Sequence, residues 1–314
     1  MGGDHAPTET VAGAVEAARR GVDVILVGAK DALERQLASH RAELPIVDAP
    51  EVIGMGDDPA RALREKAGAS ISVAVRMVAE GEAQGFLSAG STGAAMAAAA
   101  IIMGRVKGVS RPAIATIFPT PGTPTVVLDA GANPEVRPSQ LAQFGIMGSV
   151  AAEILLGIDE PRVGLLSIGE EKGKGRDLER AAYDLLEAAP IRFVGNVEGR
   201  DVATDRADVI VTDGFTGNIL LKTTEGVAQM ITTHVQEALA ALDPEIQEEA
   251  LAALAGVKAR FNWETYGGAQ LLGVKGVAVI AHGSSSRVAI ANALTMARDA
   301  ADSDLPGRLA ELLA

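Results

Sequence analysis

The sequence predicts an α/β fold, a three-layer arrangement in which a mostly parallel sheet carries helices on both faces. Short runs rich in Val and Ile recur along the chain, each ends in Gly or Asp, and helical segments lie between them. Such alternation is typical of parallel strands connected by helices. Apolar residues make up 48% of the 314 residues but aromatic residues only 3%, so Ala, Val, Leu and Ile must fill the core.

Five runs are expected to form strands, and a shorter strand is expected directly before Ser88. Each run is nearly continuous in apolar residues, as expected for a strand that is buried on both faces of a sheet. The five runs are 22–28, 123–131, 162–169, 207–214 and 276–283.

Helix signals occupy the segments between these runs. Asp58 is placed to cap a helix that has Pro59 at its first position, where the missing N–H of proline costs no hydrogen bond. The three clearest helical segments are 58–81, 177–190 and 217–241.

One segment, 240–263, interrupts the alternation of strands and helices, and we expect it to form helices that project from the body. No Pro/Ser-rich linker, low-complexity tail or fixed-period repeat divides the chain. Residues 1–314 are therefore expected to form a single domain.

Charge and composition exclude several classes of protein. The chain has 41 acidic and 28 basic residues, a net charge of -13, whereas non-specific nucleic-acid binding needs an excess of Lys and Arg. It has no cysteine, which excludes disulfides, thiolate metal sites and a cysteine acyl-enzyme. The stretch 94–103, taken as the longest uncharged apolar one, is too short to span a membrane, and the first residues do not resemble a signal peptide. These features predict a cytoplasmic protein.

Three turns rich in small residues lead from a strand towards a helix. In such a turn the backbone N–H groups can approach a ligand, and the positive end of the following helix points at it. The same residues also occur in turns for steric reasons alone. Three such turns in one sheet are expected to meet at its carboxyl edge and bind an anion. Their residues are Ser88, Gly90, Ser91 and Thr92; Asp213, Gly214, Thr216, Gly217 and Asn218; and His282, Gly283, Ser284 and Ser285.

The common phosphate-binding and nucleophile motifs are absent. The sequence has no GxxxxGK[ST], no GxGxxG and no GxSxG, which argues against a P-loop enzyme, a Rossmann dehydrogenase and a serine nucleophile on an elbow. Since there is no cysteine either, a covalent acyl-enzyme would have no obvious nucleophile in this chain. If the protein transfers an acyl group, direct attack of the acceptor molecule on the acyl donor is the simpler route. No spacing of a dedicated metal site is found, and no metal is expected.

Charged residues gather in the loop that follows the predicted strand 162–169. Glu170 and Lys174 lie there among glycines, and a lysine at a strand end is a suitable point-charge partner for phosphate. A solvated charged loop is the alternative. Lys222, one helical turn after Asn218, is a weaker candidate for the same role.

Two of the four histidines lie in glycine-rich turns. His5 and His282 could donate protons near neutral pH, or they could only tie their loops by hydrogen bonds. His40 and His234 lie in helical contexts and are expected to be surface or packing residues.

Acidic and amide side chains flank several strand ends. Asp4, Asp129, Asn133 and Asp213 are placed to contribute to the same site, but aspartates in such positions also cap helices and turns. Capping is favoured over metal coordination, because no metal-site spacing accompanies them.

Segments along the whole chain occur in the order known from one protein family. They are MGGDHAP, SAGSTGA, RPAIATIFPTP, LDAGAN, QFGIMGSVAA, IGEEKGKG, DGFTGNILLKTTEG, YGGAQLLG and AHGSSS. In these segments the chain resembles the bacterial phosphate acyltransferase (PlsX) family. The ordered set is far more specific than any single motif.

This resemblance implies an enzyme that converts long-chain acyl-[acyl carrier protein] and inorganic phosphate to acyl phosphate and free carrier protein, for phospholipid synthesis. It implies a fold similar to phosphotransacetylase and to the isocitrate and isopropylmalate dehydrogenases. It also implies a homodimer, no cofactor, and peripheral contact with the membrane, where a glycerol-phosphate acyltransferase uses the product.

Segment 240–263 is the candidate for the membrane contact. Interfacial helices usually have a basic polar face, whereas acidic residues lie between the apolar ones here, so packing in the dimer is an equal alternative. The apolar residues are Leu242, Ile246, Leu251, Leu254, Val257 and Phe261.

Roles carried over from the family's motifs concern four residues. The resemblance implies that Lys174 holds phosphate, that Asn218 stabilises the oxyanion, and that His282 or His5 protonates the leaving sulfur. Two alternatives share the architecture. One is a short-chain phosphotransacetylase or a decarboxylating dehydrogenase, which would use CoA or a nicotinamide nucleotide, and the other is a non-catalytic module that binds an acyl carrier.

The chain departs from the family pattern at three places. Ser91 stands where the family usually has Asn, and Lys174 is followed by Gly175 and Arg176 where the loop often reads KGN. The family usually has a strand and an Asp-Ala step before the segment MGGDHAP. We therefore expect the first strand of the fold to precede Met1.

Overall fold

The computed structural model describes residues 1–260 and 263–314 of the chain. Five strands expected from the sequence are confirmed in shorter form as β1, β5, β6, β8 and β10, and the short strand before the first small-residue turn is β3. The strands are β1 (Leu26–Gly28), β2 (Ile46–Asp48), β3 (Gly85–Ser88), β4 (Ala113–Phe118), β5 (Thr125–Leu128), β6 (Arg162–Leu166), β7 (Arg192–Val197), β8 (Val209–Val211), β9 (Ala269–Leu272) and β10 (Val277–Ile280).

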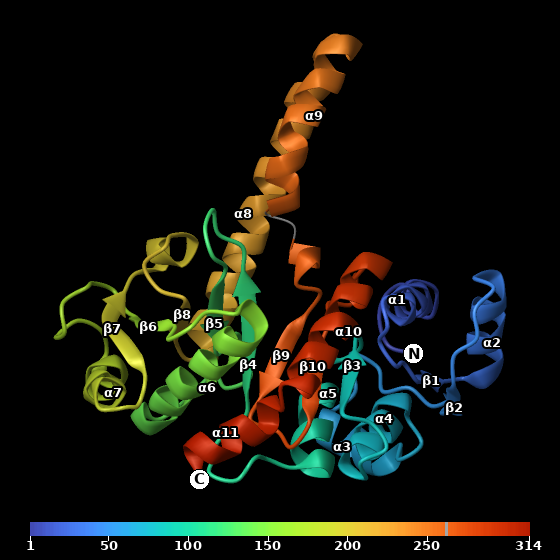
Figure 1. Ribbon diagram of the computed structural model, residues 1–314, viewed down its shortest axis with the longest axis horizontal. Helices are drawn as coiled ribbons and strands as arrows, with labels where there is room; N and C mark the ends of the chain where they lie inside the picture. The colour runs from blue at the N-terminus through green and yellow to red at the C-terminus, as the bar shows by residue number, and fades with distance from the viewer. Residues whose placement is uncertain (261–262) are drawn as a thin grey trace.

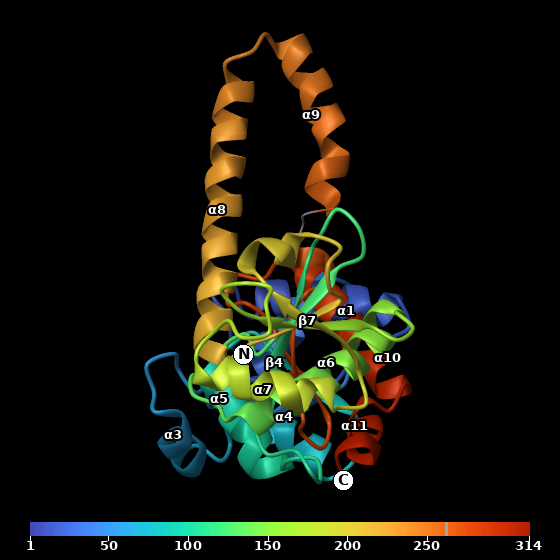
Figure 2. The ribbon, with the colours of Figure 1, turned by 90° about the vertical axis from the view of Figure 1, so that its left-hand side faces the viewer.

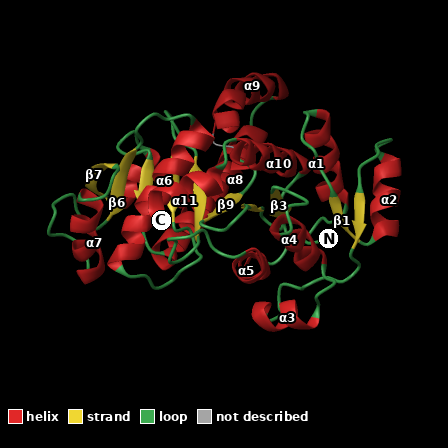
Figure 3. Cartoon of the chain, turned by 60° about the horizontal axis from the view of Figure 1, so that its bottom comes forward, coloured by secondary structure: helices red, strands yellow, loops and turns green. Residues whose placement is uncertain are grey.

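Helices cover both faces of the strands (Figure 1, Figure 3). The α-helices are α1 (Thr8–Arg19), α2 (Lys30–Ser39), α3 (Pro59–Glu65), α4 (Ser70–Ala79), α5 (Thr92–Ala98), α6 (Pro138–Leu156), α7 (Asp177–Glu187), α8 (Gly214–Ala240), α9 (Pro244–Arg260), α10 (Arg287–Asp302) and α11 (Leu305–Leu313). A π-helical turn, Ala99–Met103, continues α5, and short 3-10 helices cover Gly199–Ala203 and Trp263–Thr265.

The expected helix over 58–81 is instead two helices, α3 and α4. Asp58 caps α3 as predicted, because its carboxylate accepts the N–H of Arg61 at 2.8 Å. The chain then leaves the helix at Lys66, and the N–H of Ser70 bonds to the carbonyl of Glu51. This pairing with a distant segment interrupts the helical pattern.

The eight-stranded sheet has the order β3-β10-β9-β4-β5-β8-β6-β7, and β1 pairs with β2 in a separate sheet. Neighbours are parallel in the β3–β10 pair and throughout β5-β8-β6-β7. Strand β9 is antiparallel to β10 and β4, and β4 is antiparallel to β5. The sheet is mostly parallel, as predicted, but it consists of two parallel blocks that point in opposite directions.

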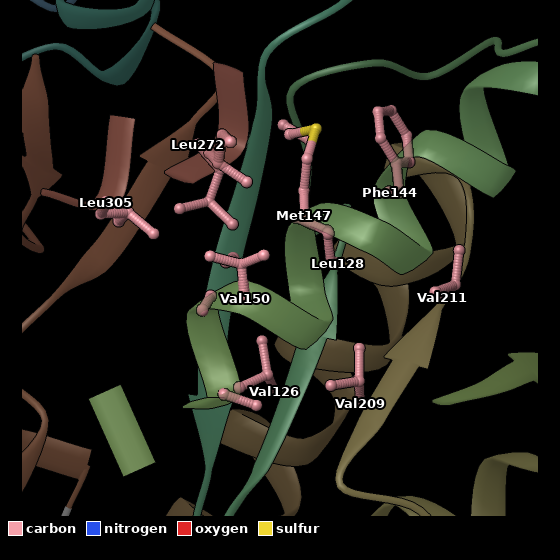
Figure 4. Close-up of a cluster of buried hydrophobic side chains, with 14 of the residues drawn as sticks. Val126, Leu128, Phe144, Met147, Val150, Val209, Val211, Leu272 and Leu305 are labelled. Carbon is pink, nitrogen blue, oxygen red and sulfur yellow. The ribbon is translucent and has the colours of Figure 1, made fainter. Parts of the chain in front are cut away.

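Alternate residues of β5 and β8 pack on opposite faces of the sheet, which explains their continuous apolar sequence. On one face, Val127 and Ile210 belong to the cluster against which Leu220 and Leu221 of α8 pack. On the other face the strands pack against α6 (Figure 4). The residues of this second cluster that come from β5, β8 and α6 include Val126, Leu128, Val209, Val211, Phe144, Met147 and Val150.

By length and composition alone, helix α6 is long and apolar enough to cross a membrane. The sequence analysis considered only the stretch 94–103 as a possible membrane span and did not consider α6. Half of its apolar window is buried inside the fold. Phe144 and Met147 are fully enclosed by neighbouring strands and helices. In this structure α6 is therefore a core helix.

Helices α8 and α9 form a hairpin that extends well beyond the rest of the molecule (Figure 1, Figure 2). The beginning of α8 packs on the sheet, but most of its remaining length is exposed. Phe261, which the sequence placed in this region, lies outside the described residues. The exposed apolar residues of the hairpin are Val227, Met230, Ile231, Val235, Leu242, Ile246, Leu251, Leu254 and Val257.

Candidate functional site

The structure places the three small-residue turns at two ends of the sheet. The turns after β3 and β10 lie at one end and the turn after β8 lies at the other, because the antiparallel strands β9 and β4 reverse the direction between them. The expectation that all three meet at one carboxyl edge is therefore wrong. We call residues 2–5, 88–92 and 282–285 the cradle, and residues 129–133 and 213–218 the aspartate turns.

Three segments of backbone are in direct contact in the cradle. The N–H of Asp4 donates to the carbonyl of Gly283 at 2.8 Å. A Cβ atom on Gly2 would lie 2.5 Å from the Cα of Gly90, so position 2 accepts only glycine without a shift of the backbone. The segment 2–5 is thereby held between the turns that follow β3 and β10.

Three helices begin at or next to the cradle, namely α1, α5 and α10. The first N–H groups of a helix have no acceptor within the helix, and they carry its partial positive charge. Ser91 caps α5 and Ser286 caps α10, because their hydroxyl oxygens accept the N–H groups of Ala94 and Ala289. The arrangement gathers positive helix ends in a protein whose net charge is -13.

Hydroxyl groups and one imidazole line the cradle. Ser285 is 3% exposed, and its hydroxyl has no hydrogen-bond partner in the described part of the chain. The Nδ1 atom of His282 lies 2.8 Å from the hydroxyl of Ser284 and 3.3 Å from its N–H, so Nδ1 is the acceptor in the neutral ring. The hydroxyl of Ser88 accepts the N–H of Gly90 at 3.2 Å.

The rim of the cradle is open to solvent. The exposed residues there are Asp4, His5, Thr92, His282 and Ser284. Among residues 1–260 and 263–314, no group of three or more His, Asp or Glu side chains could hold a metal ion. The chemistry that the cradle offers is therefore hydrogen bonding from backbone and hydroxyl groups, with imidazole at the edge.

An ion pair that was not predicted from the sequence joins two of the helix ends. The carboxylate of Glu9, in the first turn of α1, accepts hydrogen bonds from the backbone N–H and the guanidinium of Arg287, at 2.6 to 3.1 Å. These bonds lower the pKa of Glu9. The two residues are 278 positions apart, so no local pattern reveals the pair.

In the aspartate turns, Asp129 is fully buried, and both oxygens of its carboxylate accept hydrogen bonds. Its two oxygens accept the backbone N–H groups of residues 114, 131, 132 and 133 and the side-chain amide of Asn133, at 2.7 to 3.1 Å. Asn133 also donates to the carbonyl of Pro112. Both side chains hold the turn in place and face the protein interior.

Asp213 caps α8, as an aspartate at a strand end was predicted to do. Its carboxylate accepts the N–H and the hydroxyl of Thr216 and pairs with the guanidinium of Arg176, which also pairs with the buried Glu179. These two carboxylates raise the pKa of Arg176. Arg176, which the sequence marked only as a departure from the family pattern, thus fixes the charged loop to the start of α8.

The remaining predicted residues lie on the surface near the aspartate turns. Lys174 and Asn218 are exposed, and the amide of Asn218 is next to Gly131. Glu170 pairs with Arg206 at 2.9 Å. Lys174 and Asn218 therefore follow strands whose carboxyl ends point away from the end of the sheet that carries His282 and His5.

Comparison with known proteins finds relatives along almost the whole chain. A family profile described as "Fatty acid synthesis protein" matches residues 1–308. A phosphate acyltransferase of Heliobacterium modesticaldum is 52% identical over 305 residues, which cover 95% of this chain and 91% of the relative. A phosphate acyltransferase of Desulforamulus reducens is 47% identical over 317 aligned positions, which cover 100% of this chain and 95% of the relative.

Among solved structures, a phosphotransacetylase from Streptococcus pyogenes matches with a TM-score of 0.64. The match covers 93% of this chain and 91% of that chain at 17% sequence identity. At this identity the likeness concerns the fold alone. It confirms the predicted similarity to the phosphotransacetylase fold.

The Glu9–Arg287 pair predicts how stability depends on pH. Because the folded-state pKa of Glu9 is below its usual value of 4.5, the pair stabilises the fold fully above about pH 4.5, and this contribution is lost as the pH falls through the lowered pKa. We expect Glu9→Gln to lower Tm at pH 7 and to reduce the loss of Tm between pH 6 and pH 3. Thermal unfolding measured by circular dichroism tests this.

Glu43→Gln, at an exposed carboxylate between α2 and β2, is the matched control and should leave the pH dependence as in the wild type. A Glu9→Gln variant with the pH dependence of the wild type would show that the pair does not stabilise the fold.

Proposed function

This chain belongs to the phosphate acyltransferase family, and from that premise we propose that it transfers a long-chain acyl group from acyl-[acyl carrier protein] to inorganic phosphate. The observation that carries the proposal is the gathering of three helix N-termini in the cradle, together with a buried serine hydroxyl that has no hydrogen-bond partner among the described residues. Such an environment favours a small anion over an acyl chain. The acyl phosphate product would supply phospholipid synthesis at the inner face of the membrane.

We assign the phosphate to the cradle. The N–H groups at the start of α5 and the hydroxyls of Ser88, Thr92, Ser284 and Ser285 would hold its oxygens. The positive helix ends offset part of its charge. Ser91 acts indirectly, since its hydroxyl is already engaged in capping α5.

The reaction depends more on the position of phosphate relative to the thioester than on a strong base. One phosphate oxygen attacks the carbonyl carbon of the thioester, a C–O bond forms, the C–S bond breaks, and the thiolate of the carrier leaves and takes up a proton. His282, whose Nδ1 is an acceptor from Ser284, is the proposed proton donor, and His5 on the same rim is the alternative. No cofactor takes part in these steps.

Lys174 and Asn218 need a different account, because they lie at the other end of the sheet. We propose that the enzyme is a homodimer in which these residues approach the cradle of the other subunit. The proposal is supported by large apolar side chains that are exposed beside them, since an interface would cover such a surface. These side chains are Ile168, which is 83% exposed, Phe215 and Ile219.

The exposed apolar residues of the α8–α9 hairpin are the proposed contact with the membrane. The hairpin projects from the body, so its tip can enter the interfacial region while the cradle stays in water (Figure 2). Membrane contact would bring the acyl phosphate close to the membrane acyltransferase that consumes it.

An assay of the purified protein with palmitoyl-carrier protein and phosphate tests the reaction. We expect acyl phosphate and free carrier thiol in equal amounts. Ser285→Ala should raise the KM for phosphate by roughly 10-fold or more, because a hydrogen bond to a charged group is worth about 1.5–3 kcal/mol. Ser303→Ala, at the far end of α10, should behave as the wild type.

The same assay separates the alternative functions. Activity with acetyl-CoA alone would favour a short-chain phosphotransacetylase, and nicotinamide-dependent turnover would favour a dehydrogenase. Carrier binding without thiol release would favour a binding module.

Mixed dimers test whether the site is shared. We expect His282→Ala and Asn218→Ala each to lose most activity, and their equimolar mixture, after unfolding and refolding together, to regain about a quarter of wild-type turnover. Half of the refolded dimers would be mixed, and each mixed dimer would have one intact site. If both residues act within one chain, the mixture should remain as inactive as the separate variants.

Flotation with phosphatidylethanolamine–phosphatidylglycerol vesicles tests the hairpin. Leu254→Glu should reduce the fraction that floats, because it places a charge among apolar residues that enter the interface. Gln236→Glu, which adds the same charge at a polar position of α8, is the control. Unchanged flotation of Leu254→Glu would remove the hairpin as the contact.

A further inference from the structure

Four exposed cations gather on the side of the molecule opposite to the α8–α9 hairpin. Three come from the loop between the π-helical turn and β4, and the fourth comes from the turn between β9 and β10. We call these residues the basic patch: Arg105, Lys107, Arg111 and Lys275. Acidic residues outnumber basic ones in the whole chain, yet the segments 104–112 and 273–276 contain none.

Hydrogen bonds hold the segments of the basic patch in place. The N–H of Lys275 donates to the carbonyl of Gly104 at 3.0 Å. The side-chain amide of Gln143, in α6, donates to the carbonyl of Gly108 at 2.9 Å and accepts the N–H of Ser110 at 3.0 Å. The basic patch is therefore supported by α6 and by the β9–β10 turn, and its backbone is fixed before any partner binds.

The cations of the basic patch are not neutralised by nearby carboxylates. None of the four has an ion-pair partner among residues 1–260 and 263–314. Elsewhere on the surface exposed cations do pair, as Lys172 does with Glu187 at 2.8 Å. One nitrogen of Arg105 donates to the carbonyl of Ser110, which leaves the rest of the guanidinium at the surface. Like charges that gather without counter-charges repel one another, and a negative partner relieves that repulsion.

A large apolar side chain is exposed beside these cations. Ile101 is 65% exposed and lies in the π-helical turn, which ends at Gly104. Such turns are rare, and they frequently occur at functional sites. An apolar side chain with polar groups around it is typical of a protein–protein interface, which has an apolar centre and a polar rim.

The position of the basic patch indicates the class of partner. The loop 104–112 touches the end of α11, since a Cβ on Gly108 would lie 1.7 Å from the carbonyl oxygen of Leu313. The C-terminus lies at the bottom of Figures 1 and 2, and the hairpin, the proposed membrane contact, extends from the top. The basic patch then faces water and not the lipid surface. Because the net charge of -13 disfavours nucleic acid, an acidic protein is the partner that fits.

The basic patch lies at the end of the sheet that carries the aspartate turns. The loop 104–112 leads into the start of β4, which pairs with the end of β5. The carbonyl of Pro112 accepts the side-chain amide of Asn133 at 2.8 Å. A protein on the basic patch is therefore at the same end of the sheet as Lys174 and Asn218, to which the proposed function assigns a role.

We propose that the basic patch and Ile101 form the docking surface for an acidic protein, and that this protein is the carrier that donates the acyl group. The identification of the partner rests on the proposed function, whereas the charge and exposure of the surface do not. The cations attract the carrier and set its orientation, and Ile101 is buried under it. The cradle keeps its separate role in holding phosphate.

Binding and turnover of a charge-reversed variant test the proposal. Calorimetry with the carrier protein that has a free thiol measures binding without reaction, and the assay with palmitoyl-carrier protein measures KM and kcat. We expect Lys107→Glu/Lys275→Glu to weaken binding and to raise the KM for the acyl carrier, each at least about tenfold, with kcat and the KM for phosphate unchanged. Added salt should weaken binding by the wild type more than binding by the variant.

Two further variants control this experiment. Arg35→Glu/Arg41→Glu reverses two exposed cations near α2 that also have no ion-pair partner in the described part of the chain, and it should bind the carrier as the wild type does. Ile101→Ser should weaken binding with the salt dependence of the wild type, because it removes apolar contact and no charge. Tm of each variant, measured by circular dichroism, verifies that it is folded.

Four results would overturn the docking surface. They are unchanged carrier binding by Lys107→Glu/Lys275→Glu, equal loss in both double variants, a changed mass in light scattering, and reduced flotation with phosphatidylglycerol vesicles. A changed mass would identify an interface between copies of this chain, and reduced flotation would identify a membrane contact. Carrier binding that needs the basic patch without acyl transfer would refute the proposed function alone, whereas transfer with an unchanged KM would refute the docking surface alone.

Discussion

The reversal of strand direction at β9 and β4 determines the layout of the molecule. A parallel strand delivers its carboxyl end, and the start of the next helix, to one end of a sheet. Because two antiparallel strands stand at the centre, β3 and β10 deliver theirs to one end and β5, β8 and β6 to the other. Chemistry that depends on helix starts is therefore divided between the cradle and the aspartate turns.

The two ends differ in how their polar groups are used. In the aspartate turns, the carboxylates of Asp129 and Asp213 accept hydrogen bonds from backbone N–H groups, a hydroxyl and Arg176. These carboxylates therefore hold the turns in place. In the cradle, the hydroxyl of Ser285 has no partner among the described residues and the rim is open to solvent. A buried polar group without a partner is costly, and a bound ligand that pairs with it recovers that cost. We therefore propose the cradle, rather than the aspartate turns, as the site that binds a small anion.

Features set by neighbouring residues could be predicted from the sequence. The continuous apolar runs of β5 and β8 follow from burial on both faces, and the cap formed by Asp58 follows from a local hydrogen bond. The direction of β9 and β4 could not be predicted, because it is set by pairing between strands that are far apart in the chain. For the same reason the break between α3 and α4, which involves Glu51, and the pair of Glu9 with Arg287 left no local signal.

Helix α8 connects the aspartate turns to the exposed hairpin. It begins at Gly214, directly after its cap Asp213, crosses the face of the sheet and continues into the exposed hairpin as one helix of 27 residues, about 40 Å long at about 1.5 Å per residue. A Cβ on Gly217 would lie 1.9 Å from the carbonyl oxygen of Asp129, so the first turn of α8 is clamped against its support. The same close contact therefore determines the position of Asn218, the next residue, and the direction in which the hairpin leaves the sheet.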